Sequence, residues 1–208
     1  MFSRSFALLV SSCLLINALA AAEPEADKQA SQARTLFDFN GEKDLSRWQI
    51  VNDGVMGGRS TSRVQLQADV EMKFSGNLSL ANNGGFASTR SRGASLSLKR
   101  GDVIVLTVKG DGRKYNFNAY VPRRRMAFSY RADFKTVKGE WIEVRIPLRQ
   151  LVATSFGREV RGASLDPAEV NSVGILLGDK KPGAFELLIK SIEVESAGDV
   201  KEFTLTAG

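Results

Sequence analysis

The chain has 208 residues, of which 43% are hydrophobic and 25% are charged, a composition typical of one folded domain rather than of a disordered, collagenous or polytopic protein. Its 29 Lys and Arg residues outnumber its 23 Asp and Glu residues, and the resulting net charge of +6 is too small to name a partner. The absence of histidine excludes serine-histidine and cysteine-histidine catalytic pairs, histidine general bases and histidine metal ligands.

The N-terminus has the pattern of a secretory signal peptide over residues 1–22. Arg4 gives it a positive start, residues 6–19 form an apolar stretch, and small residues before position 23 suit a cleavage site. Because this stretch is shorter than the roughly 20 residues of a spanning helix, we expect an exported protein, periplasmic or secreted, with no transmembrane segment in the mature chain. Processing as a lipoprotein at Cys13, the single cysteine, stays open as the alternative.

Residues 23–34 are polar and alanine-rich and are expected to be a lead-in to a folded domain at 35–195. In that domain apolar residues alternate more often than they recur at helical spacing. The pattern predicts strands at 62–66, 70–74, 78–80, 95–98, 103–108, 115–121, 128–134, 141–146, 173–177 and 185–194. Residues 196–208 are expected to be a tail or an extra strand.

Helix is expected only as brief turns, at residues 147–151 and 166–170. Glycine, asparagine and proline clusters separate the predicted strands at fairly regular intervals. Many short strands without long helices predict an all-β protein, built as an antiparallel two-sheet β-sandwich. In the strand at 141–146 we expect Ile142, Val144 and Ile146 to face inward and Trp141 to face outward.

Two glycine-rich stretches, at 52–60 and 82–90, are the strongest candidates for a functional site. Glycines let the backbone approach a neighbour closely, and amide, hydroxyl and guanidinium groups can bind a polar ligand. The candidate residues in these stretches are Asn52, Asp53, Gly57, Gly58, Arg59, Ser60, Asn82, Gly84, Gly85, Phe86, Ser88 and Arg90. The same residue types also form simple turns, and an Arg90 that ties Asp53 internally would make both stretches structural.

The two stretches, together with residues 74–80 between them, resemble the complex I intermediate-associated protein family. That family is named for a factor that assembles mitochondrial NADH:ubiquinone oxidoreductase. The matching segments are residues 52–60, 74–80 and 84–90, in this order and at close spacing, and weaker similarity extends over 36–194. The resemblance implies a galactose-binding-like jelly roll, a fold shared with many carbohydrate-binding modules. The predicted export signal departs from the mitochondrial members of the family.

Three functions are compatible with these observations. The first is a non-catalytic module that binds, or helps to assemble, a protein partner through the glycine-rich stretches with Arg59 and Arg90. The alternative is a carbohydrate-binding module for cell-wall or extracellular glycans that uses Trp141, Tyr120, Asn82 and Arg90, because aromatic rings can stack on sugars. An enzyme with Asp53 as general base ranks last, since no second catalytic group can be named.

No cofactor or metal ion is expected from the sequence. The carboxylates are scattered singly in turns, and the alternating acids of a calcium loop do not occur. The basic cluster at 123–125 lies close to aromatic residues, as in some nucleic-acid sites. The modest net charge favours a solvated loop there, so no nucleic-acid partner is expected.

Overall fold

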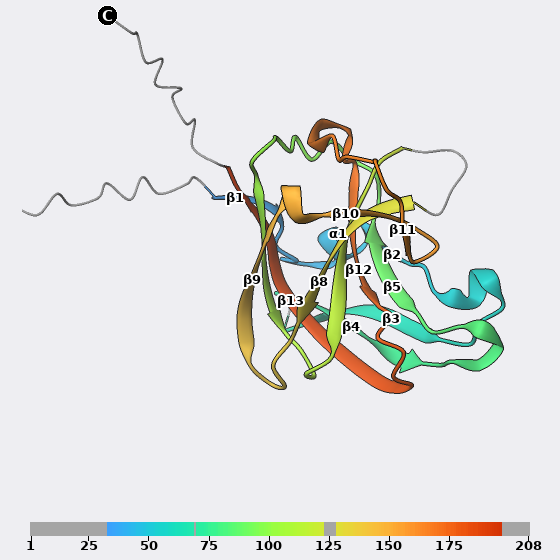
Figure 1. Cartoon of the computed structure of the whole chain (residues 1–208). Helices are drawn as coiled ribbons and strands as arrows, with labels where there is room; N and C mark the ends of the chain where they lie inside the picture. The colour runs from blue at the N-terminus through green and yellow to red at the C-terminus, as the bar shows by residue number, and fades with distance from the viewer. Residues whose placement is uncertain (1–32, 69, 123–127, 197–208) are drawn as a thin grey trace, which may run out of the picture.

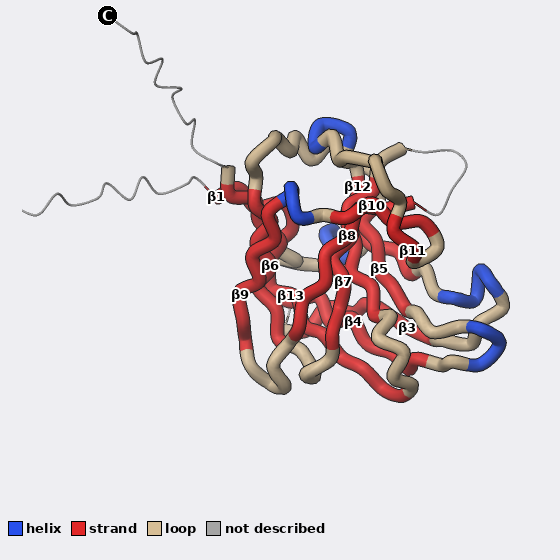
Figure 2. The backbone as a smooth tube through the Cα atoms, viewed as in Figure 1, coloured by secondary structure: helices blue, strands red, loops and turns tan. Residues whose placement is uncertain are grey.

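The computed structural model describes residues 33–68, 70–122 and 128–196, which form two antiparallel β-sheets packed face to face (Figures 1 and 2). This architecture confirms the predicted all-β two-sheet sandwich. The predicted signal peptide, the basic cluster at 123–125, most of the lead-in and nearly all of the predicted tail lie outside the described residues. The first strand begins at Ala33, and the last one ends at Glu195.

The first sheet has the strand order β3-β4-β13-β6-β9, with β1 also paired to β13. Its strands are β1 (Ala33–Phe37), β3 (Thr61–Gln67), β4 (Glu71–Leu78), β6 (Val103–Lys109), β9 (Trp141–Pro147) and β13 (Gly183–Glu195). Strand β13 is long enough to pair with β4 through its first half and with both β6 and β1 through its second half. It therefore forms the centre of this sheet.

The second sheet has the order β11-β10-β8-β7-β12-β5-β2. Its strands are β2 (Trp48–Ile50), β5 (Ala87–Ser91), β7 (Lys114–Tyr120), β8 (Phe128–Lys135), β10 (Val152–Ser155), β11 (Arg158–Glu159) and β12 (Ser172–Leu177). Strand β5, which carries the second glycine-rich stretch into the sheet, pairs with β12 on one side and β2 on the other. The outer face of this sheet is called the seven-stranded face below.

Within the described residues, helical structure is limited to single turns, as the sequence predicts. These are α1 (Glu42–Leu45) and the 3₁₀ turns η1 (Asp53–Met56), η2 (Ala81–Asn83), η3 (Leu148–Gln150) and η4 (Pro167–Glu169). Turns η3 and η4 confirm the two predicted positions, and the Asp166 side chain caps η4 by accepting from the Ala168 N–H. In the described part of the chain, no helix has the length and apolarity needed to cross a membrane.

The strand predicted at residues 95–98 is wrong, because this segment runs as a loop between β5 and β6. Its alternating Leu96 and Leu98 are buried in the core, so the pattern correctly marks an inward face. The backbone leaves the extended region at Ser97, where φ is 49°, and the Arg34 guanidinium donates to the Leu96 carbonyl at 2.8 Å in place of a neighbouring strand. The separate strand predicted at 78–80 is also wrong, since β4 ends at Leu78.

The core lies between the two sheets and is filled by alternate side chains of each strand. In β9, Ile142, Val144 and Ile146 pack inward while Trp141 is 40% exposed, which confirms the predicted faces. Trp48 is buried, and its ring packs against Phe37 at a centroid distance of 5.1 Å. The loops that leave the sheets are therefore anchored on a packed aromatic core.

An ion pair with little exposed side-chain surface ties the two sheets together at the start of β13. Arg113 precedes β7, and its guanidinium donates to both carboxylate oxygens of Asp179, at 3.1 and 2.7 Å. It also donates to the carbonyls of Gly183 and Ala184 at the start of β13, so it joins the seven-stranded sheet to the six-stranded one. We call this group the Arg113 clasp.

Candidate functional site

The two glycine-rich stretches form adjacent loops at one end of the sandwich, lower right in Figure 1, in cyan and green. The Asn82 side-chain amide donates to the Gly57 carbonyl at 3.2 Å, which joins the two tips. Ser60 joins them at the base, because its hydroxyl accepts from the Ser79 N–H at 3.0 Å. We refer to residues 52–60 and 79–86 as the paired loops.

Asp53 is the centre of the paired loops and is almost completely buried. Its carboxylate accepts from the Ser60 N–H at 2.9 Å and from the Ser60 hydroxyl at 2.6 Å. From the other loop it accepts from the Gly85 N–H at 2.7 Å and the Phe86 N–H at 3.3 Å. A single side chain therefore holds two segments that are more than 30 residues apart in the chain.

Gly58 and Gly84 form the walls around this carboxylate. A Cβ atom on Gly58 would lie 2.5 Å from Oδ1 of Asp53, and one on Gly84 would lie 2.5 Å from Oδ2. Both distances are far below van der Waals contact, so a side chain at either position would displace the carboxylate. Gly58 and Gly84 are explained by this close approach, without any ligand.

The surroundings of Asp53 set its ionisation. Burial alone would raise the pKa of this carboxyl group, but the hydrogen bonds from Ser60, Gly85 and Phe86 outweigh burial and hold the pKa below its ordinary value. The carboxylate is thus ionised at neutral pH, and its hydrogen bonds are already made to the protein. A general base instead needs a raised pKa and access to a substrate proton, so the geometry does not suit Asp53 for that role.

Asn52 and Ser88 strengthen the base of the paired loops. The Asn52 side-chain oxygen accepts from the Ser62 hydroxyl at 2.7 Å and from the Ser88 N–H at 3.2 Å. The Ser88 hydroxyl donates to the Val51 carbonyl. Both side chains are therefore committed to the protein itself.

The outward side of the paired loops is apolar. Val55 and Met56 in η1 are 74% and 61% exposed, and Leu80 at the start of the other loop is 42% exposed. We call these three residues the apolar tip. Arg59 is exposed beside it and pairs with no described residue, while Lys180 donates to the Gly84 carbonyl at 3.4 Å. The sequence analysis missed the apolar tip, because the hydrophobic residues there occur inside a turn motif.

Arg90 does not interact with Asp53, because the Arg90 side chain lies on the seven-stranded face. Its guanidinium carbon lies 3.4 Å from the centroid of the Tyr120 ring, and its Nε donates to the Ser172 hydroxyl at 3.3 Å. Burial lowers the pKa of Arg90, and no carboxylate among the described residues pairs with it. The structure thus separates Arg90 from the paired loops that the same stretch of sequence builds.

The residues considered for glycan binding lie in three places. Tyr120 and Arg90 lie together on the seven-stranded face, whereas Asn82 belongs to the paired loops. Trp141 is on the edge strand of the other sheet, paired with Lys109. The structure therefore does not gather these four side chains around one sugar.

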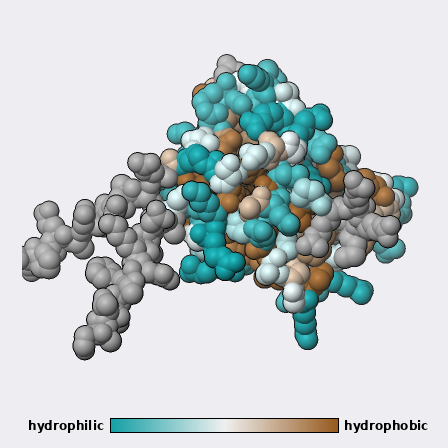
Figure 3. All heavy atoms as spheres, turned by 90° about the horizontal axis from the view of Figure 1, so that it is seen from above, coloured by the Kyte–Doolittle hydropathy of each residue, from teal (hydrophilic) through white to brown (hydrophobic). Residues whose placement is uncertain are grey.

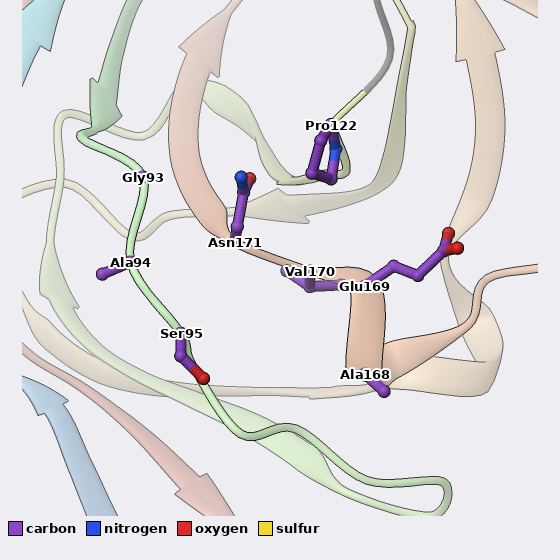
Figure 4. A pocket seen from close by; sticks show the side chains of 8 residues that line it. All are labelled: Gly93, Ala94, Ser95, Pro122, Ala168, Glu169, Val170 and Asn171. Atoms are coloured by element: carbon purple, nitrogen blue, oxygen red, sulfur yellow. The ribbon is translucent and has the colours of Figure 1, made fainter.

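An open depression of about 620 Å³ lies between residues 93–95 and 168–171, next to Pro122 (Figure 4). The Ala94 N–H donates to the Asn171 carbonyl at 2.8 Å and holds the two segments together. The Glu169 carboxylate points away from the residues on the opposite side in Figure 4. Seen from above, the molecule shows hydrophilic residues with hydrophobic ones exposed between them (Figure 3). None of the candidate residues lines the depression, and no described group of three acidic or thiol side chains could hold a metal ion.

Comparison with known proteins gives both a family and a fold. The model of the family described as complex I intermediate-associated protein 30 matches residues 37–189, a range that includes the paired loops and Arg90. The mitochondrial complex I intermediate-associated protein 30 of Mus musculus is 29% identical in sequence. That match covers 78% of this chain and 56% of the mouse protein, so the chain spans about half the length of the curated relative.

Among solved structures, the family 11 carbohydrate-binding module of a Clostridium thermocellum cellulosomal cellulase is similar, with a TM-score of 0.59 and 15% sequence identity. The match covers 81% of this chain and 96% of that module. The family 11 module from the same organism, in complex with a mixed-linked tetrasaccharide, gives a TM-score of 0.57 at 16% identity, and the match covers 79% and 96% of the two chains. At this level of identity the similarity concerns the fold.

Proposed function

The chain belongs to the complex I intermediate-associated protein 30 family, and from this premise we propose that it is a non-catalytic module that binds a protein partner and helps to assemble it. The observation that carries the proposal is the rigid display of the apolar tip. Hydrophobic side chains such as Val55 and Met56 are exposed on loops that Asp53 holds in one conformation. Loops ordered in advance lose less entropy on binding.

The chemistry of the tip suits a protein surface. Exposed apolar side chains rimmed by polar groups are typical of protein–protein contacts, and a medium-sized flexible residue such as Met56 adapts to a partner. Arg59 adds a cation that pairs with no described residue and so is available to an acidic group of that partner. The proposed binding surface consists of the apolar tip and Arg59. The buried Asp53 and the glycines around it are not part of this surface.

The partner is proposed to be an exported or membrane protein. This part of the proposal rests on the signal-peptide pattern at residues 1–22. The mouse relative is mitochondrial by name, so the two proteins would share the domain and the assembly role but act in different compartments.

Glycan binding is the second candidate, supported by the fold shared with carbohydrate-binding modules. The positions of the aromatic residues argue against it. A face of the Tyr120 ring is already covered by Arg90, and Trp141 lies in the other sheet. We therefore place protein binding first.

Site-specific photocrosslinking in cells that produce the full chain tests the proposal. A photoreactive residue at position 55 should capture one dominant exported or membrane protein, and the same residue at position 143, on the outer side of β9, should not. Capture from position 55 should disappear when Met56→Glu places a charge on the apolar tip. Equal capture from both positions, or capture that survives Met56→Glu, would contradict protein binding through the tip.

A further inference from the structure

A third loop, the connection between β12 and β13 at residues 178–182, lies against the paired loops and adds a cation to their surface. The Lys180 ammonium donates to the Gly84 carbonyl at 3.4 Å. A Cβ atom on Gly85 would lie 2.7 Å from Nζ of Lys180 and 3.1 Å from Cδ2 of Leu80. Lys180 and Leu80 both reach the position that a side chain on Gly85 would fill, so the lysine lies beside the apolar tip.

The Arg113 clasp holds the turn that carries Lys180. The Asp179 carboxylate accepts from the Lys181 N–H at 3.2 Å, and the Arg113 guanidinium donates to the Lys181 carbonyl. Between these two residues, the backbone of Lys180 is left-handed, with a φ of 60°. A residue other than glycine seldom adopts this conformation unless its surroundings hold it there. The fold therefore sets the position of Lys180 beside the apolar tip.

The charge of Lys180 is not neutralised within the described part of the protein. Lys180 and Arg59 are exposed, and neither forms an ion pair with a described residue. The carboxylates of these loops are already used, because Asp53 accepts from groups of the paired loops and Asp179 is paired with Arg113. The surface of the three loops thus combines exposed apolar side chains with two cations that no described acid neutralises.

The chemistry of this surface defines what complements it. Apolar side chains of a partner can pack on Val55, Met56 and Leu80, and a carboxylate gains from an ammonium group that is already held in place. A purely apolar segment would desolvate Lys180 and Arg59 without giving them a partner, which costs binding energy. A purely acidic segment would leave the apolar tip in water. The complementary segment therefore carries both kinds of side chain.

We propose that Lys180 selects the partner of the apolar tip, and that this partner presents an acidic amphipathic segment, in which an apolar residue packs on the tip while an Asp or Glu side chain pairs with Lys180. This inference rests on the proposed function, because it concerns the same surface. It adds the loop between β12 and β13 to that surface and names the chemistry of the partner. A membrane surface is disfavoured, because anionic lipids are typically bound by clusters of about four to eight basic residues.

Photocrosslinking from position 55 in the full chain, followed by peptide mapping, identifies the segment to be tested. Mass spectrometry of the captured protein should place the contact in a segment that carries Asp or Glu beside apolar residues. A contact segment without an acidic residue would overturn the inference and leave the proposed function standing. Absence of any captured protein would overturn both.

A synthetic peptide of that segment measures the role of Lys180. Fluorescence anisotropy with the full chain compares this acidic peptide with a version that carries Asn or Gln in place of its Asp or Glu. Lys180→Gln should weaken binding of the acidic peptide about fivefold and change binding of the amide peptide by less than about twofold, because only the acidic peptide loses an ion pair. Lys190→Gln, at an exposed position of β13, is the matched control and should change neither.

Two results with these variants would overturn the role of Lys180. One is an equal effect of Lys180→Gln and Lys190→Gln on the acidic peptide, and the other is equal weakening of both peptides by Lys180→Gln. Vesicles of phosphatidylcholine and phosphatidylglycerol test the alternative occupant. Binding of the full chain to these vesicles that Lys180→Gln abolishes, without binding of the acidic peptide, would also overturn the inference, because the occupant would then be a lipid surface.

Discussion

Two buried carboxylates, Asp53 in the paired loops and Asp179 in the Arg113 clasp, are held by different chemistry. Asp53 accepts hydrogen bonds only from neutral N–H and O–H groups of Ser60, Gly85 and Phe86. Asp179 is paired with the guanidinium of Arg113, and the two side chains are only 6% and 12% exposed. Both arrangements lower the pKa of the carboxyl group although burial alone would raise it.

The two regions differ in the side chains that they expose at the surface. The clasp uses its arginine internally and joins the two sheets. The paired loops need no cation inside, so Arg59 faces the solvent beside the apolar tip. A carboxylate bound by backbone N–H groups thus holds a loop whose charged and apolar side chains stay exposed, whereas a carboxylate bound by arginine joins two sheets.

The largest effect is expected from breaking the clasp. Arg113→Ala leaves the carboxylate of Asp179 buried without its cation, so the free energy of unfolding should fall by about 3–5 kcal/mol. Urea unfolding followed by circular dichroism measures the change. The double variant Arg113→Ala with Asp179→Ala removes both charges and should be more stable than Arg113→Ala alone. A double variant less stable than the single one would contradict the idea that the unpaired, buried carboxylate of Asp179 causes the loss.

A smaller loss of stability is expected from Asp53→Asn. The amide can present only one oxygen to its donors and turns an NH₂ group toward the N–H of Gly85 or Ser60, which costs about 2–3 kcal/mol. The same urea experiment measures it. Asp166→Asn is the matched control, because asparagine caps the η4 turn as well as aspartate does. Equal losses in the free energy of unfolding at the two positions would mean that the hydrogen bonds around Asp53 stabilise the fold no more than an exposed helix cap does.

The two carboxylates also predict how stability depends on pH. Their folded pKa values lie below the ordinary value near 4, so their contribution is fully present above about pH 4 and is lost as the pH falls through the folded pKa values. Asp53→Asn removes one of the two groups and should flatten the loss of stability below about pH 4. Urea unfolding at a series of acidic pH values checks this, and an unchanged slope would rule out the contribution of Asp53.

The smallest change in stability is expected at the apolar tip. Val55→Ser combined with Met56→Ser alters exposed side chains, so the free energy of unfolding should stay within about 0.5 kcal/mol of the original. Crosslinking from position 80 should nevertheless lose the partner protein. A large loss of stability would mean that the tip is part of the core of the loops rather than a surface that they display.

The strands that face a deep core were readable from the sequence, and the polar ones were not. In β6 and β9 apolar residues reveal the inward face, and both strands are present. Strand β5 has the sequence Ala-Ser-Thr-Arg-Ser, whose inward Thr89 is fully buried but polar, so no hydrophobic alternation marks it. Conversely, Leu96 and Leu98 alternate as in a strand while the backbone turns at Ser97. Alternating hydrophobic residues indicate which side chains are buried. They do not show whether the backbone pairs with a neighbouring strand.

The glycine-rich stretches were identified from the sequence, but the different structural roles of Asp53 and Arg90 within them were not. The role of Asp53 depends on contacts to Gly85 and Phe86, which lie more than 30 positions further along the chain. The stacking of Arg90 on Tyr120 depends on the strand β12 that separates β5 from β7. Both relations come from the pairing of strands, which no local pattern encodes.

The cage around Asp53 implies two rates of evolutionary change within one short motif. A substitution of Gly58 or Gly84 collides with the carboxylate, so these positions and Asp53 can change only together. Substitutions of Val55 and Met56 leave the cage intact, because these side chains are mostly exposed to solvent. Descendants of one ancestral loop can therefore diverge in the side chains that they expose while keeping the glycine-rich signature by which their kinship is detected.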